Sequence, residues 1–274
     1  MNVKVFGLTD KGKIRENNQD SYLINEEEQL FIVSDGLGGR ASGEIASKLA
    51  VKSFEAFMIR SKKEKIKWPV KPRKGLTPLQ NRMVAAALYS NHKILKKGRK
   101  IPALKGMGAA VLGVAVKDNK LCALNAGDCR LYRIRDDKII QLTEDLTLVG
   151  EEERKGNISS EEAKNHPKKH ILSSALGHLE SNRKIGLLQT GIKENDIFLL
   201  CTDGLYRLID EHGILNIITG LINKSLYQMG MTLVLKANLA GGTDNITIVL
   251  LSFGEDTSRI EKGNTDAELE HKQQ

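Results

Sequence analysis

Four carboxylates stand beside short apolar runs, and this placement is the strongest chemical signal in the chain. They are Asp35, Asp128, Asp203 and Asp244. A single Asp-Gly pair, as at 35–36 or 203–204, most often marks a turn. Four carboxylates at strand ends, however, can converge from separate parts of the chain, as an oxygen-rich site for magnesium or manganese requires. We therefore expect these aspartates to surround a divalent-metal site.

The first of these aspartates lies between an apolar run and a glycine-rich segment. Residues 30–33 are Leu, Phe, Ile and Val, which suit a buried strand better than a helix of that length. Gly36, Gly38 and Gly39 follow Asp35 and permit left-handed turns, and they leave no side chain to block a close approach. This arrangement is typical of a metal or phosphate site.

Length and composition predict a globular, cytoplasmic protein. The chain has 274 residues, of which 40% are hydrophobic, so it can bury a substantial core. No apolar run approaches the roughly 20 residues of a membrane helix, and residues 1–13 lack the apolar core of a signal peptide. Cys122, Cys129 and Cys201 have no zinc-type spacing and fit a reducing compartment. We expect a monomer without a membrane partner.

The net charge of +8 is unevenly distributed. Between Lys65 and Lys117 there are thirteen Lys or Arg residues and no Asp or Glu. Such a region is either a solvated basic surface or a patch for an acidic partner, and that partner could be a phosphorylated protein, nucleic acid or an anionic surface. Its only aromatic residues are Trp68 and Tyr89, so few side chains are available to stack on nucleic-acid bases. Nucleic acid is therefore the weaker alternative.

Periodic patterns predict the elements that must position the carboxylates. Apolar residues recur at helical spacing from residue 44 to about 60, and a second helix begins at the capping box Thr77–Gln80. A helical turn is expected over 205–209 and a helix over 227–239. The expected strands cover residues 3–8, 22–24, 30–33, 109–116, 120–124, 130–135, 138–142, 187–190, 197–201 and 246–253.

These elements predict an α+β fold, an antiparallel β-sandwich flanked by helices on both outer faces. Two strand pairs in succession, 109–124 and 130–142, indicate hairpins. The polar residues 144–170 are interpreted as a surface flap with one short helix, and residues 255–274 as a disordered polar tail. Because no other boundary is visible, residues 1–254 are expected to form a single catalytic domain.

Eight segments of the chain resemble, in order, the metal-dependent protein phosphatases of type 2C, the PPM family, in its compact bacterial form. They are RENNQD (15–20), SDGLGGRASGEIAS (34–47), NAGDCRLY (125–132), QLTED (141–145), GNISSEEAKNHP (156–167), SSALG (173–177), CTDGLY (201–206) and GGTDNIT (241–247). The resemblance covers nearly the whole chain. It implies a four-layer α-β-β-α fold and hydrolysis of phosphoserine and phosphothreonine on proteins.

The same resemblance implies a role for each clustered aspartate. Asp35 would bridge two Mn²⁺ or Mg²⁺ ions that share an activated water, and this water attacks phosphorus directly. The Gly36 carbonyl would join the second ion, whereas Asp203 and Asp244 would complete the coordination of the first. Asp128 would help to bind a third, weaker ion together with Asp203.

The resemblance also implies two residues that serve the reaction without binding metal directly. Arg15 would bind the phosphate, because a guanidinium fork suits two phosphate oxygens, and Asp20 would hold metal-bound waters. Gln19 stands where many members carry glutamate, so affinity for the second metal is expected to be lower. Leu37 stands where eukaryotic members have a histidine proposed to protonate the leaving alkoxide, so we expect a metal-bound water in that role or no dedicated acid.

The leading hypothesis is an active phosphatase that opposes a bacterial serine/threonine kinase. Its expected partners are phosphorylated proteins, among them that kinase and its substrates. The alternative is a catalytically silent relative that binds phosphoproteins and regulates a partner. Because the departures from the family pattern leave Asp35, Asp203 and Asp244 in place, the enzymatic hypothesis is favoured.

Overall fold

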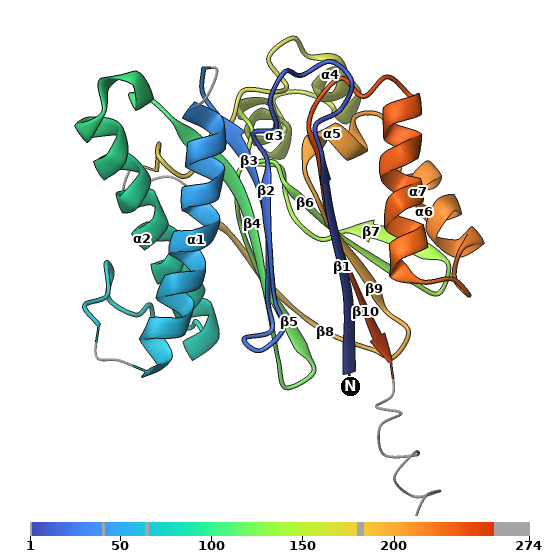
Figure 1. Cartoon of the computed structure of the whole chain (residues 1–274), viewed down its shortest axis with the longest axis horizontal. Coiled ribbons are helices and arrows are strands. Elements are labelled where there is room, and N and C mark those ends of the chain that lie inside the picture. Colours follow the sequence, from blue (N-terminus) through green and yellow to red (C-terminus); the bar gives the residue numbers. More distant parts are fainter. Residues whose placement is uncertain (1, 40–41, 64–65, 180–183, 255–274) are drawn as a thin grey trace, which may run out of the picture.

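Two antiparallel sheets lie face to face between two layers of helices in the computed structural model, which describes residues 2–39, 42–63, 66–179 and 184–254 (Figure 1). The strands are β1 (Asn2–Asp10), β2 (Ser21–Asn25), β3 (Leu30–Leu37), β4 (Gly108–Lys117), β5 (Lys120–Ala126), β6 (Arg130–Arg135), β7 (Lys138–Gln141), β8 (Gly186–Gly191), β9 (Ile197–Cys201) and β10 (Ile246–Gly254). The helices are α1 (Ser42–Lys63), α2 (Pro78–Lys100), α3 (Leu148–Arg154), α4 (Ser160–Asn165), α5 (Asp203–Tyr206), α6 (Glu211–Gly220) and α7 (Leu226–Leu239), with a 3-10 turn η1 (Pro102–Leu104). The α+β sandwich with helices on both outer faces is confirmed.

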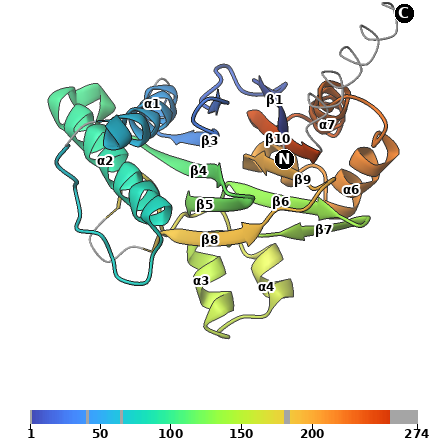
Figure 2. The ribbon, with the colours of Figure 1, turned by 90° about the horizontal axis from the view of Figure 1, so that it is seen from below.

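The strand order of each sheet brings distant segments together. One sheet has the order β1-β10-β9-β6-β7 and the other β2-β3-β4-β5-β8, and Figure 2 shows the two sheets stacked with α3 and α4 projecting from them. The predicted hairpins are β4–β5 and β6–β7, and they lie in different sheets. Each turns through two residues, Asp118-Asn119 and Asp136-Asp137, with φ between 51° and 55°, the left-handed values that tight hairpin turns require.

Three apolar layers hold the sandwich together, and β3 shows how one strand serves two of them. Phe31 and Val33 pack between the sheets, whereas Leu30 and Ile32 pack against α1 and α2. Side chains alternate along a strand, so a strand covered on both faces must be apolar at every position. This explains the unbroken apolar run before Asp35. The third layer lies between the other sheet and α6 and α7.

Four local predictions need correction or fall outside the described residues. Helix α6, which follows the Asp210 cap and buries Ile214 and Ile218, is not predicted from the sequence. The flap contains α3 and α4, two short helices where one is predicted. The predicted helical turn over 205–209 begins earlier, at Asp203. The tail predicted over 255–274 lies outside the described residues. None of the described helices is long and apolar enough to cross a membrane.

An ion pair between the partly exposed Arg135 and the buried Asp196, just before β9, supplies a test of the fold. Asp196 is fully buried, and the Arg135 guanidinium donates to both of its carboxylate oxygens at 2.5 Å. We expect Arg135→Ala to lower the free energy of unfolding by about 3 kcal/mol, because it leaves a buried carboxylate without its cation. Urea denaturation would measure the loss. The matched control is Lys138→Ala on the exposed surface, which should change it by less than about 0.5 kcal/mol.

Candidate metal centre

The four aspartates meet in one cleft at the end of the two sheets where α5 lies. Helix α5 is near the top of Figure 1. Asp35 lies near the end of β3, Asp128 follows β5, Asp203 opens α5 directly after β9, and Asp244 lies just before β10. All four line a cleft of about 490 Å³, together with Arg15 and Gly36. The structure therefore brings together every predicted site residue that the sequence analysis places at the metal or the phosphate, except Asp20.

Asp20 lies behind the cleft wall and links the two sheets. It is 5% exposed, and the hydroxyl of Thr202 donates to its Oδ2 at 2.8 Å. Asp20 precedes β2 of one sheet, whereas Thr202 lies between β9 of the other sheet and α5. This hydrogen bond fixes the position of the part of the site on one sheet relative to the part on the other. Thr202 has no role predicted from the sequence, because it lies 182 positions from Asp20 along the chain.

Asn245 fixes the loop that carries Arg15, and the sequence analysis gives it no separate role. Its side-chain amide donates to the carbonyls of Lys11 and Asn17 at 2.8 and 3.0 Å. Its Oδ1 accepts from the backbone N–H of Gln19 at 2.8 Å. The only signal in the sequence was its position next to Asp244.

Two glycines allow the backbone segments of the site to approach one another closely. A Cβ at Gly36 would lie 2.1 Å from the carbonyl oxygen of Gly43, and a Cβ at Gly204 would lie 2.0 Å from that of Asn245. No side chain fits at such distances. The Asp-Gly pairs at 35–36 and 203–204 thus reflect close packing at the site and are not simply surface turns.

Burial and mutual repulsion raise the pKa values of Asp20, Asp35, Asp128 and Asp203. The pKa of Asp20 and that of Asp128 rise to about 7, and the pKa of Asp203 rises to about 6, chiefly because burial disfavours the charged form. Burial, and then the charges of Asp20 and Asp203, raise the pKa of Asp35 well above its usual range. Ionising this cluster requires a counter-charge, which a divalent cation supplies.

The orientation of the carboxylates shows which oxygens a cation could use. Asp203 Oδ1 is buried and has no hydrogen-bond partner among the described residues. Asp244 Oδ2 accepts from Arg15 at 2.7 Å and Asp203 Oδ2 from Arg207 at 2.6 Å. Within the described ranges, no three His, Cys, Asp or Glu side chains already surround one point. An all-oxygen donor set with an unsatisfied buried oxygen nevertheless fits magnesium or manganese once Asp244 turns from its arginine.

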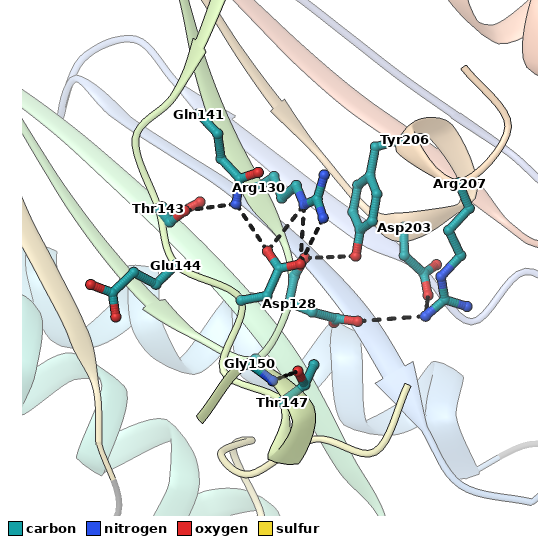
Figure 3. Close-up of polar contacts among 12 residues, drawn as sticks. Asp128, Arg130, Gln141, Thr143, Glu144, Thr147, Gly150, Asp203, Tyr206 and Arg207 are labelled. Carbon is teal, nitrogen blue, oxygen red and sulfur yellow. Dashed lines mark hydrogen bonds and ion pairs between the residues drawn. The ribbon is translucent and has the colours of Figure 1, made fainter. Parts of the chain in front are cut away.

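A second cavity, of about 540 Å³, adjoins the cleft beneath the flap. The two cavities share Asp128, His170 and Arg207. Beside them the guanidinium of Arg130 lies 3.7 Å from the centre of the Tyr206 ring (Figure 3). The same guanidinium donates to Asp145 through two nitrogens. Arg207 and His170 lie outside the family-like segments, so neither has a role predicted from the sequence.

The raised pKa values predict how the metal-free protein responds to pH. In the unfolded chain an aspartate titrates near 3.9, so the folded values of about 6 to 7 for Asp20, Asp128 and Asp203 mean that the folded state binds more protons. The stability from these groups is present in full below about pH 4 and is lost as pH rises through 7.

We therefore expect the melting temperature in chelator to fall by roughly 5 °C or more between pH 5 and pH 8. Differential scanning calorimetry would measure it. Added Mn²⁺ should remove most of the fall, and Asp20→Asn should make the fall in chelator smaller without abolishing it, because Asp128 and Asp203 still titrate. A melting temperature in chelator that rises over this range would contradict the prediction.

A site that gathers oxygen ligands for divalent cations beside an arginine is suited to phosphate esters, so the fold and the site define a metal-dependent phosphatase. Residues 13–240 match the family model described as "Protein phosphatase 2C". The chain belongs to that family.

Similar proteins come from several bacteria. The serine/threonine phosphatase stp of Listeria welshimeri is 32% identical over 251 residues, which cover 89% of this chain and 93% of that protein. The crystal structure of the Mycobacterium tuberculosis serine/threonine phosphatase PstP/Ppp has a TM-score of 0.79 and 28% identity, and the match covers 92% and 99% of the two chains. A structure of the PstP catalytic domain in complex with two manganese ions has a TM-score of 0.75 and 27% identity, with the same coverage. The resemblance stated from the sequence is confirmed.

Proposed function

We propose that this protein hydrolyses phosphoserine and phosphothreonine on proteins with the help of two Mn²⁺ or Mg²⁺ ions. The observation that carries the proposal is the convergence of Asp35, Asp128, Asp203 and Asp244 on one cleft. The name of the Listeria relative and the two manganese ions of the PstP structure support the same activity and the same cofactor. The reaction is therefore metal-dependent hydrolysis of a phosphate monoester.

The aspartates and one carbonyl would form the metal centre. Asp35, the carbonyl of Gly36, Asp203 and Asp244 would hold the two ions, which when bound supply an activated water and neutralise charge on the phosphoryl group. Asp20 keeps one carboxylate oxygen fixed by Thr202, and it would use its remaining acceptor capacity to orient water behind the cleft. Together these residues would position the attacking water and restrict the directions from which it can approach the phosphoryl group.

Arg15 would bind the phosphate oxygens of the substrate. Its side chain is 54% exposed at the mouth of the cleft, so it can leave Asp244 and turn to an incoming phosphate. Leu37 offers no proton to the leaving alkoxide. His170 lines the cleft, but burial and the charges of Arg207 and Lys169 lower its pKa, so it is neutral at pH 7 and a poor acid.

We also propose that the substrates are products of a serine/threonine kinase, because transfer from a nucleoside triphosphate is the reaction that makes these phosphate esters. We propose that the basic region, residues 65–117, does not bind nucleic acid. Its two aromatic residues, Trp68 and Tyr89, pack on Phe57 with ring centroids 5.8 and 5.4 Å away, and they support the core. A cytoplasmic monomer remains the proposed state.

Phosphate release from a phosphothreonine peptide tests the proposal. We expect release that depends on Mn²⁺ or Mg²⁺ and stops when the ions are chelated. A silent phosphoprotein-binding relative would bind the same peptide, as fluorescence anisotropy would show, without releasing phosphate at any metal concentration. That second result would overturn the enzymatic function and favour the regulator.

A further inference from the structure

A guanidinium lies between two aspartates at the position where the sequence analysis expects a third, weaker ion. Arg207 Nη2 lies 2.6 Å from Asp203 Oδ2 and 3.6 Å from Asp128 Oδ2 (Figure 3). The side chains of both aspartates are 8% exposed, and that of Arg207 is 32% exposed. The chain therefore already places a positive charge between this buried pair of carboxylates.

The backbone of Arg207 is fixed to Asp203, and this keeps the guanidinium beside the Asp128–Asp203 pair. Arg207 follows Asp203 by four residues, and its backbone N–H donates to the Asp203 carbonyl at 3.0 Å. Residues at this spacing lie on the same face of a helical turn. The side chain also lines both the cleft and the cavity beneath the flap. Arg15 differs, because it stands on an exposed loop and, among the residues that the structure describes, forms an ion pair only with Asp244.

The two oxygens of Asp203 have separate surroundings. Oδ2 pairs with Arg207, whereas Oδ1 is buried without a partner among the described residues. Asp203 can thus serve one of the two proposed ions through Oδ1 while Oδ2 stays with the guanidinium. An additional ion that used Asp128 and Asp203 Oδ2 together would have to displace Arg207 or share its position. Charge repulsion at such short range opposes sharing.

We propose that Arg207 replaces the third cation in this protein, so that the enzyme binds two divalent ions and the Asp128–Asp203 pair is neutralised from within the chain. The proposal rests on the two-ion centre of the proposed function. It assigns Arg207 a positioning role for Asp203 and removes Asp128 from the metal ligands. The measurable consequence is the number of ions bound at high metal concentration.

Counting bound Mn²⁺ by equilibrium dialysis, with total Mn²⁺ raised to about 5 mM to reach weak sites, tests the proposal. We expect two ions in the wild type, a third in Arg207→Ala, and two again in the double variant Asp128→Asn/Arg207→Ala. Arg207→Lys keeps a positive charge and should bind two. Circular dichroism would establish that each variant is folded.

Two results would overturn the proposal: a third ion in the wild type that Asp128→Asn removes, or a folded Arg207→Ala variant that still binds two ions. The wild type and Asp128→Asn still test the proposal if Arg207→Ala does not fold. The proposal requires each of these two proteins to bind two Mn²⁺ ions. A wild type that binds no Mn²⁺ would instead overturn the metal centre of the proposed function.

Discussion

Asp35→Asn is expected to lower phosphatase activity by about 10³-fold or more, while the protein stays folded. In the proposed centre Asp35 is a ligand of both ions, so the loss of its negative charge weakens the binding of both. A thousand-fold loss corresponds to about 4 kcal/mol of lost transition-state stabilisation. Two metal ions that supply the nucleophile and neutralise the phosphoryl charge can account for a loss of this size. Phosphate release from a phosphothreonine peptide at saturating Mn²⁺ would measure the effect.

The same substitution should separate loss of metal from loss of fold. Burial and the charges of Asp20 and Asp203 raise the pKa of Asp35, so its ionised form is costly in the metal-free protein. A neutral amide removes that cost. We therefore expect the melting temperature of Asp35→Asn in chelator at pH 8 to equal or exceed that of the wild type. Added Mn²⁺ should raise it less than it raises that of the wild type.

The matched control for Asp35 is Asp137→Asn. It makes the same chemical change in a surface turn at φ 52°, a conformation that asparagine adopts readily. Its activity and its response to Mn²⁺ should equal those of the wild type. If Asp35→Asn kept more than a tenth of the activity, Asp35 would not be the shared ligand and the two-ion centre would have to be assigned to other residues.

The local features of the fold could be predicted from the sequence because each depends on neighbouring residues. The apolar run before Asp35 predicted a buried strand, and the structure shows Phe31 and Ile32 buried on opposite faces of β3. The capping box predicted at Thr77–Gln80 is present at the start of α2. Such signals need no knowledge of the tertiary structure. By contrast, α6 has only ten residues and no capping box, and its helical pattern was missed.

The site was only partly predictable, because it depends on where the chain crosses between sheets. Asp128 lies between β5 and β6, which belong to different sheets, and Asp20 lies on the connection from β1 to β2, which also changes sheet. Spacing along the chain does not reveal such crossings. The family-like segments identified these aspartates, but the contacts from Thr202 to Asp20 and from Arg207 to Asp128 join residues that only the folded chain brings together.

Arg15→Ala is expected to lower kcat/KM for a phosphothreonine peptide by about 10²- to 10³-fold, the usual cost of removing one group that stabilises charge on the reacting oxygens. Arg15→Lys should recover only part of the loss, since an ammonium cannot bind two phosphate oxygens side by side. Inorganic phosphate should inhibit Arg15→Ala more weakly than it inhibits the wild type. Steady-state kinetics at saturating Mn²⁺ would measure all three effects.

The ion pair between Arg15 and Asp244 makes this prediction specific to a phosphate-binding role. If Arg15 served mainly to hold Asp244, its removal would disturb the metal centre and weaken Mn²⁺ binding. A phosphate-binding arginine instead competes with the ions for Asp244 Oδ2, at 2.7 Å, so Arg15→Ala should bind Mn²⁺ as tightly as the wild type or more tightly. The matched control is Lys13→Ala, which removes an exposed positive charge from the same loop outside the cleft wall and should leave kcat/KM within about twofold. Weaker Mn²⁺ binding by Arg15→Ala, with phosphate inhibition unchanged, would assign Arg15 to the support of Asp244 and leave the phosphate to another group.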